Sequence, residues 1–137
     1  MQIAGALSRR EDAPGLVLCS SARRTQQTLE PIRAALASRL RVQIERDLYL
    51  ASAEALLARI AKIAEHEPGA LLIGHNPGLH ELAVALASRG PRDELARLRA
   101  KLPTAALVVL ELDAASWRDV EPGCGRLVEL LLPREPE

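Results

Sequence analysis

The stretch that decides the fold is "ALLIGHNPGLHELAVAL", residues 70–86. Its first residues form a continuous apolar run, as expected of a strand buried on both faces of a sheet. Pro77 is a favourable residue in the first turn of a helix, and leucines then recur at helical spacing. The stretch therefore predicts a strand over 70–74 and a helix from Pro77 to the Gly90-Pro91 pair, with His75 at the junction.

A second junction of the same kind lies upstream, in "VLCSSARRTQQT", residues 17–28. A strand is predicted over 15–19, and each of the two serines that follow it can cap a helix start. Apolar residues continue at helical spacing as far as Leu40. Pro31 falls inside this helix, so we expect a kink or a break there.

The rest of the chain continues the alternation of strands and helices. The other expected elements are a short strand over 41–45, a helix from Ser52 that stops at Pro68-Gly69, a charged helix over 92–101, and strands over 105–112 and 126–132 that pair as a β-hairpin. This order predicts a three-layer α/β fold, with a mostly parallel sheet, flanking helices and an antiparallel addition. No internal repeat or linker is visible, so we expect a single domain over 1–137.

The composition excludes several classes of function. The 137 residues are 48% hydrophobic, which is enough for one sizeable core. Eighteen basic and 18 acidic residues cancel, so no net charge attracts nucleic acid or a membrane surface. Trp117 and Tyr49 are the only aromatic residues, too few for a base-stacking surface. We expect neither a nucleic-acid nor a membrane partner, so a local site must hold any bound anion.

Neither the cysteines nor the histidines have the spacing of a metal site. Cys19 and Cys124 are far apart, and "HNPGLHE" lacks the one-turn spacing of the helical zinc motif. We therefore expect no metal and no other cofactor. The first residues are too short an apolar stretch for a signal peptide, and no run reaches membrane-spanning length, which predicts a cytoplasmic protein.

The two junctions together predict a phosphate site. In an open α/β sheet, helix starts gather at the carboxyl edge of the strands, where unpaired N–H groups favour an anion. Arg23 and Arg24 lie in a first helical turn, where the helix dipole normally disfavours cations. An arginine in that place suggests that an anion binds between it and the helix end, gripped at two points by the planar guanidinium.

Simpler interpretations apply to several of these residues. Only one of the two adjacent arginines can face the sheet edge, so Arg23 is expected on a solvated face. A single histidine after a strand is often only a helix cap. His66 is expected at the end of an exposed helix, and His80 is expected to face solvent. A cysteine-dependent phosphatase loop is rejected, because Thr25 stands where that loop needs its arginine.

The blocks "VLCSSARRTQQTLE" and "LLIGHNPGLHELA" resemble those of the histidine phosphatase (phosphoglycerate mutase-like) superfamily, in particular its small bacterial phosphohistidine phosphatases. The second block, Gly-His-Asn-Pro-Gly, is matched in full, and the segments "LYLASAEALL" and "LPTAALVVLELDAASW" also look like this branch. The resemblance implies hydrolysis of phosphohistidine or a small phosphoester through a phosphohistidine intermediate. It implies that Arg24 and His75 are catalytic, and that Ser20 and the N–H of Asn76 bind phosphate beside them.

The chain departs from this family at its nucleophile. Family members attack phosphorus with a histidine in an Arg-His motif, and no Arg-His pair occurs in this sequence. The segment "MQIAGALSRRED" looks like the helix that follows that motif, so we expect an N-terminally truncated, inactive form of the fold. The alternatives are a non-catalytic phosphate-binding relative, and a sheet reclosed alone or by pairing in a homodimer. Loss of the motif's strand is expected to leave the strands at 15–19 and 70–74 without a ladder neighbour between them.

Overall fold

The computed structural model describes residues 2–8, 10, 14–36 and 40–133. They form a mixed α/β structure with two three-stranded sheets and flanking helices. The chain divides into two compact units: unit 1 is Met1–Ala51 with Ala64–His75, and unit 2 is Ser52–Ile63 with Asn76–Glu137. The prediction of a single domain over 1–137 stays a prediction.

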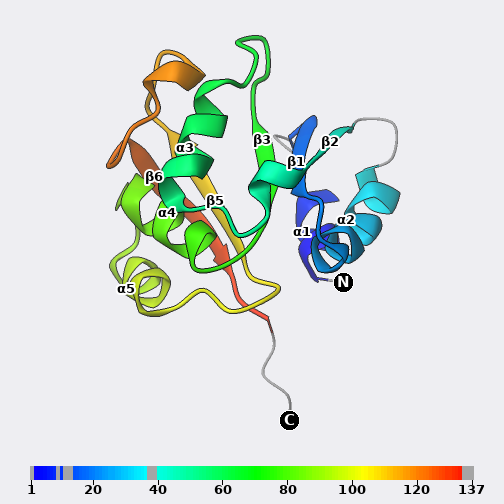
Figure 1. Cartoon of the computed structure of the whole chain (residues 1–137). Helices are drawn as coiled ribbons and strands as arrows, with labels where there is room; N and C mark the ends of the chain where they lie inside the picture. Colours follow the sequence, from blue (N-terminus) through cyan, green and yellow to red (C-terminus); the bar gives the residue numbers. More distant parts are fainter. Residues whose placement is uncertain (1, 9, 11–13, 37–39, 134–137) are drawn as a thin grey trace. The chain divides into compact units, whose positions relative to one another are not determined.

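The described residues of unit 1 form a parallel sheet with two α-helices and one 3-10 helix. Its elements are α1 (Gln2–Ser8), β1 (Leu16–Ser20), α2 (Arg23–Leu36), β2 (Arg41–Glu45), the 3-10 helix η2 (Arg46–Leu48) and β3 (Ala70–Ile73). The strand order is β2-β1-β3, and both pairings of β1 are parallel. Figure 1 shows α1 beside α2, and α2 packs against β1 and β3. The sequence predicted all three strands, because each is a short apolar or alternating run.

The central strand of unit 1 corrects one expectation. β1 hydrogen-bonds directly to β3, with Leu16 opposite Ala70 and Cys19 opposite Ile73. The predicted gap between these strands is therefore wrong, and so is the need for a partner chain to fill it. β1 is buried along its whole length, so its backbone groups require a neighbour on each side, and β2 and β3 provide them.

Helix α2 also differs from expectation. It runs from Arg23 to Leu36 without a break at Pro31, which stands inside it. Its buried residues are Thr25, Leu29, Ile32 and Leu36. A proline removes one helical hydrogen bond, and this packed apolar stripe offsets the loss. The predicted continuation over 37–39 lies outside the described residues, as do residues 1, 9, 11 and 12 of the predicted N-terminal helix.

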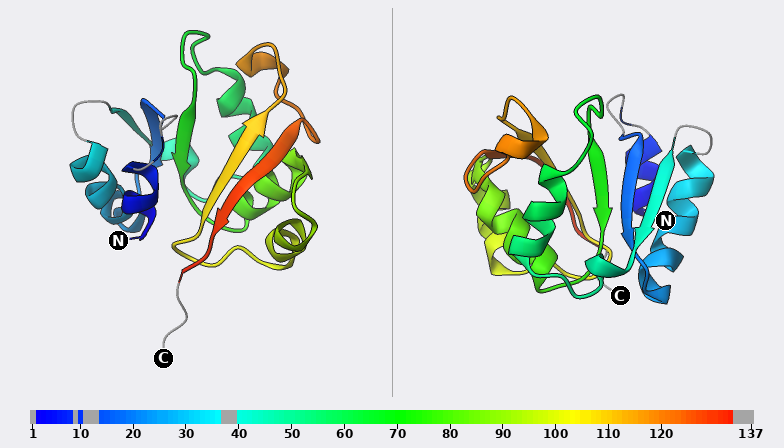
Figure 2. Two further views of the ribbon diagram at one scale, coloured as in Figure 1. Left: turned by 180° about the vertical axis from the view of Figure 1, so that it is seen from behind. Right: turned by 45° about the horizontal axis from the view of Figure 1, so that its top comes forward.

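Unit 2 contains the second sheet and three α-helices. Its elements are α3 (Ala53–Ala61), α4 (Gly78–Leu86), β4 (Ala87–Arg89), α5 (Arg92–Ala100), β5 (Leu107–Leu112), the 3-10 helix η3 (Trp117–Asp119) and β6 (Gly125–Leu131). β5 and β6 run antiparallel, as predicted, and lie side by side in Figure 2. β4 pairs with β6 in parallel, so the antiparallel addition belongs to a separate sheet.

Two elements of unit 2 were not predicted as they stand. α3 is capped by Ser52, as expected, but it ends at Ala61, well before Pro68. Three residues after α4 form β4 where the sequence predicted continued helix. Gly90 follows β4 with a φ of 147°, and a Cβ there would lie 2.9 Å from the Leu127 Cβ. Glycine therefore allows the turn from β4 into α5 to pass close to β6.

The buried side chains of unit 2 gather where its helices meet the sheet. Leu98 and Leu127 are both completely buried and belong to one cluster with Ala83, Ala87 and Leu95. These residues connect α4 and α5 to β4 and β6. Among the described helices, none has the length and apolarity needed to cross a bilayer.

Candidate functional site

The first feature of the site is a hydrogen bond between the two predicted junctions. His75 follows β3 and Ser20 ends β1, so parallel pairing of these strands brings the two residues to the same edge. The His75 Nε2 lies 2.8 Å from the Ser20 Oγ. Ser20 is 0% exposed, and its Oγ also accepts the N–H of Ala22 at 3.3 Å. The observed partner of Ser20 is thus His75, and direct contact with phosphate stays a prediction.

A second group, Tyr49, contacts the His75 ring and was missed by the sequence analysis. The two ring centroids are 5.2 Å apart and the planes meet at 78°, an edge-to-face arrangement. Tyr49 follows η2, whose Leu48 is buried, and its N–H donates to the Arg46 carbonyl at 3.0 Å. The only signal in the sequence was that a chain with two aromatic residues places one of them in this turn.

The loop from β1 into α2 is held by its own polar side chains. The Thr25 Oγ1 lies 2.8 Å from the carbonyl oxygens of both Ser20 and Ala22. The Gln26 Nε2 donates to the Ser21 carbonyl at 2.8 Å, and the Ser21 N–H donates to the Glu45 carbonyl at 3.2 Å. These bonds fix the backbone where α2 begins, and the first N–H groups of a helix lack internal partners.

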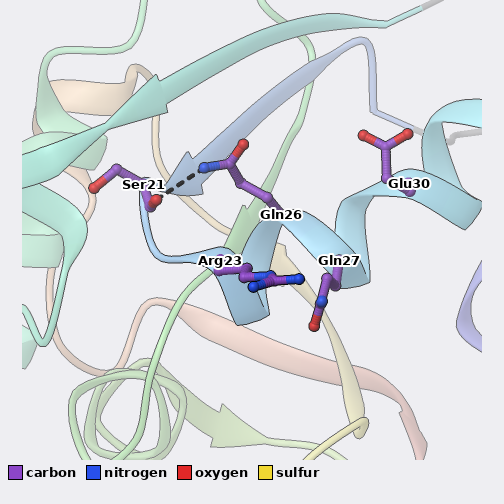
Figure 3. Close-up of a pocket in the computed structure, with 5 residues that line it drawn as sticks. All are labelled: Ser21, Arg23, Gln26, Gln27 and Glu30. Atoms are coloured by element: carbon purple, nitrogen blue, oxygen red, sulfur yellow. Dashed lines mark hydrogen bonds between the residues drawn. The ribbon is translucent and has the colours of Figure 1, made fainter.

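The two arginines at the start of α2 are both exposed. Arg23 lines a shallow, open pocket with Ser21, Gln26, Gln27 and Glu30 (Figure 3). Arg23, Gln27 and Glu30 follow one stripe of the helix, spaced by about one turn. Arg24 is the next residue and therefore lies about 100° around the helix from that stripe. Which of the two arginines faces the sheet edge stays a prediction.

Asn76 belongs to unit 2, where its side chain makes two hydrogen bonds to neighbouring backbone groups. Its Nδ2 donates to the Leu102 carbonyl at 2.6 Å, and its Oδ1 accepts the N–H of His80 at 3.2 Å. The side chain thus caps the first turn of α4, where Pro77 makes no side-chain cap. The role predicted for Asn76 concerns its backbone N–H and stays a prediction.

The other two histidines lie away from this cluster. His66 precedes β3 while His75 follows it, so the two stand at opposite ends of the strand. His66 contacts Glu67 at 3.2 Å, and Arg41 forms an ion pair with the same carboxylate. The His80 Nε2 donates to the Leu98 carbonyl at 2.6 Å. The expectation that His80 faces solvent is therefore wrong, because α5 provides an acceptor for its ring.

The thiol of Cys19, one residue before the end of β1, is in surroundings that disfavour its reactive form. Cys19 is 0% exposed, and burial raises the pKa of its thiol above the usual value, although Thr25 and Arg33 act in the opposite direction. A thiol with a raised pKa has little thiolate, the nucleophilic form. Within the described ranges, no group of three or more His, Cys, Asp or Glu side chains could hold a metal ion.

Comparison with proteins of known sequence gives relatives in mycobacteria. The Mycobacterium tuberculosis proteins MT1313 and Rv1276c, both uncharacterised, are each 37% identical over 120 residues, covering 86% of this chain and 73% of the relative. ML1117 of Mycobacterium leprae, also uncharacterised, is 30% identical over 130 residues, which are 91% of this chain and 76% of ML1117. No profile of a known protein family matches the chain.

Comparison with solved structures gives SixA proteins. The candidate phosphohistidine phosphatase SixA of Agrobacterium tumefaciens aligns with a TM-score of 0.77 and 28% identity, covering 96% of this chain and 76% of SixA. The corresponding candidate from Nakamurella multipartitia has a TM-score of 0.79 at 23% identity, covering 96% and 78%. A protein histidine phosphatase SixA with bound tungstate has a TM-score of 0.71 at 20% identity, covering 95% and 76%. The chain therefore belongs to the family of the mycobacterial proteins MT1313 and Rv1276c, and it has the mixed α/β fold of SixA-type, phosphoglycerate mutase-like proteins in the histidine phosphatase superfamily.

Proposed function

We propose that the chain is the phosphate-binding part of a histidine-type phosphatase that hydrolyses phosphohistidine or a small phosphoester through a phosphohistidine intermediate. The observation that carries the proposal is the 2.8 Å hydrogen bond between His75 and Ser20. It joins the ends of β3 and β1 at the point where α2 begins with two exposed arginines. A neutral or protonated imidazole there can donate to a phosphoryl oxygen.

In this proposal each predicted residue has a separate task. The Arg24 guanidinium grips two phosphoryl oxygens, and its exposed place in the first turn of α2 leaves it able to reach a ligand. His75 stabilises the charge that develops on the phosphoryl group during transfer. The backbone N–H of Asn76 is a further donor. The phosphorylated partner is a protein or a small phosphoester.

The nucleophile is the part that these 137 residues do not supply. The sequence contains no Arg-His pair, and the structure gives both remaining histidines other partners. In this proposal neither His66 nor His80 is the nucleophile. We therefore propose that a nucleophilic histidine is carried on a further strand, which a longer form of the protein would contain.

The sheet of unit 1 favours one place for such a strand. Among the described residues, β3 pairs with β1 alone, so its other edge is open, as is the outer edge of β2. β2 carries polar side chains at Arg41, Gln43 and Glu45, which is how proteins protect an edge strand. β3 is apolar throughout and partly buried, an edge that needs a neighbour. The additional strand is therefore expected to pair with β3.

A second candidate function is that of a non-catalytic phosphate-binding module. The absence of an Arg-His pair favours it, while the retained arginine and histidine explain the binding. Both functions predict weak binding of phosphate or of an analogue such as tungstate or vanadate. Charge-assisted hydrogen bonds contribute about 1.5–3 kcal/mol each, so after association costs a site of roughly millimolar affinity is expected.

A paired assay distinguishes the two functions. Release of phosphate from phosphohistidine and from a small phosphoester is measured for the 137-residue chain and for a version extended by an Arg-His strand. The incomplete-enzyme proposal predicts turnover by the extended chain alone, together with slower hydrogen exchange of the β3 amides. Turnover by the short chain that His75→Ala abolishes would show that the nucleophile is misassigned. Absence of turnover in both, with binding retained, would favour the binding module.

A further inference from the structure

The hydroxyl of Ser20 constrains the protonation of the His75 ring. A serine hydroxyl has one proton to donate and two lone pairs to accept with. One lone pair of the Ser20 Oγ accepts the Ala22 N–H at 3.3 Å. In the described part of the chain, the His75 Nε2, at 2.8 Å, is the acceptor within reach of the Ser20 hydroxyl proton. A neutral ring in this arrangement accepts at Nε2 and carries its own proton on Nδ1.

The opposite nitrogen of the ring is left for a ligand. The Nδ1 of His75 makes no hydrogen bond to any residue that the structure describes, and the side chain is partly exposed. Fixing Nε2 as the acceptor therefore makes Nδ1–H the donor of the ring.

Tyr49 restrains the same ring on another side. Its edge-to-face contact with His75 limits rotation of the imidazole about its own axis, which a single hydrogen bond does not. The turn that carries Tyr49 is held by two backbone hydrogen bonds, from the Tyr49 N–H to the Arg46 carbonyl at 3.0 Å and from the Ala51 N–H to the Leu48 carbonyl at 3.3 Å. Tyr49 is nevertheless 56% exposed, so it is not placed to fill a core.

We infer that Ser20 and Tyr49 are positioning residues for His75, which hold Nε2 toward Ser20 and leave Nδ1–H as the donor to a bound phosphate. The role of Nδ1–H as donor to phosphate rests on the proposed function, whereas the tautomer of His75 in the ligand-free protein does not. Ser20 acts by accepting the Ala22 N–H and donating to Nε2. Tyr49 acts through the position of its ring, so its hydroxyl is not required.

The first test is the tautomer of His75 in the chain without ligand. Long-range ¹H–¹⁵N correlation spectra of ¹⁵N-histidine-labelled protein are recorded at about pH 8.5, where an ordinary imidazole is neutral, with His75→Asn to assign the signals. A protonated Nδ1 and an unprotonated Nε2 are expected, with a shift toward the Nε2–H form in Ser20→Ala. A protonated Nε2 in the unaltered chain, or an unchanged pattern in Ser20→Ala, would overturn the inference. Thr25→Val is the matched control, because it removes two hydrogen bonds at the same helix start without touching His75.

The second test measures inorganic phosphate binding to the same variants. Ser20→Ala and Tyr49→Leu are each expected to weaken binding about two- to tenfold, the range for one hydrogen bond or one aromatic contact. Tyr49→Phe is expected to bind as the unaltered chain does, because the ring is retained. An equal loss of phosphate affinity in Tyr49→Phe and Tyr49→Leu would contradict a role for the Tyr49 ring. The predicted tautomer in a chain that binds no phosphate would support the positioning of His75 and refute the proposed function.

Discussion

The two strand-to-helix junctions hold their polar side chains in opposite ways. At the end of β1, the short side chains of Thr25 and Gln26 bond back to the local backbone, and no described residue pairs with the guanidinium of either arginine. At the end of β3, the side chains reach outward: His75 to Ser20, and Asn76 to Leu102. The first junction thus carries exposed guanidinium groups, unpaired among the described residues, on a hydrogen-bonded backbone, and the second carries an imidazole ring that is held by its neighbours.

This difference predicts a division of labour between affinity and orientation. An exposed cation without a partner gains most from an anion, because it forms charge-assisted bonds where it had none. A ring already held by its neighbours adds less binding energy but provides a donor in a fixed direction, which matters most when charge develops during transfer. The predictions below test this contrast.

The largest expected effect is at the first junction. Arg24→Gln should weaken phosphate binding by about tenfold or more, because a bond to a charged donor contributes about 1.5–3 kcal/mol. Isothermal titration or ¹H–¹⁵N NMR at low salt measures this change. Arg23→Gln is the matched control, since it removes the same charge from the neighbouring stripe of α2 and should change binding by less than about twofold. A larger loss of phosphate binding in Arg23→Gln than in Arg24→Gln would show that Arg23, and not Arg24, grips the phosphate.

A smaller effect is expected at the second junction. His75→Gln should weaken phosphate binding about two- to tenfold, as for one hydrogen bond, because the arginine remains in place. In an extended chain that turns over substrate, the same change should lower kcat more than it raises KM, since the ring acts on the transition state. A rise in KM without a change in kcat would indicate that His75 serves only ground-state binding.

Asn76 should matter for stability rather than for the anion. Asn76→Ala removes the cap of α4 and should lower the free energy of unfolding by about 1 kcal/mol in urea titrations. Its backbone N–H is unchanged, so phosphate binding should stay within about twofold. Ser52→Ala gives a comparison, because the Ser52 Oγ caps α3 by accepting the Ala55 N–H at 3.1 Å. Strong loss of phosphate binding in Asn76→Ala alone would assign its side chain to the site.

The smallest effect concerns pH and the buried thiol at the first junction. Because burial raises the pKa of Cys19, the unfolded chain loses the thiol proton at lower pH than the folded chain does. The free energy of unfolding should therefore fall as pH rises above the ordinary thiol range of about 8.5. Urea midpoints of Cys19→Val should show a shallower decline between neutral and alkaline pH than those of the unaltered protein. If Cys124→Ala showed the shallower decline and Cys19→Val did not, the pH dependence would belong to the half-buried Cys124 and not to Cys19.

Much of the fold follows from local pattern, whereas the pairing of strands does not. The apolar runs at 16–20 and 70–73 identify buried strands, and Ser52 identifies a helix start, because each depends on neighbouring residues alone. That β1 and β3 lie side by side depends on contacts far apart in the sequence, and the expectation taken from the family resemblance, a missing strand between them, was wrong. β4 is too short to show an alternating pattern.

The site shows the same limit. His75 was predicted because its junction is visible in the sequence, and the family resemblance selected Arg24 over Arg23; the roles of both residues stay predictions. The hydrogen bond of His75 to Ser20 requires the register of β1 against β3, and its contact with Tyr49 requires the path of the chain after β2. Neither register nor loop path follows from the spacing of residues, so the partners of His75 appeared only in the structure.

The central claim is that Arg24 and His75 hold the same anion, and one NMR titration tests it directly. Inorganic phosphate is added to the 137-residue chain while the Arg24 side-chain Nε–H and the His75 ring nitrogens are followed together. Both signals are expected to shift with a single dissociation constant in roughly the millimolar range, and in Arg24→Gln the His75 ring signals are expected to shift only at about tenfold higher phosphate concentration. Signals that move with two different constants, or a His75 ring that does not respond while Arg24 does, would contradict it.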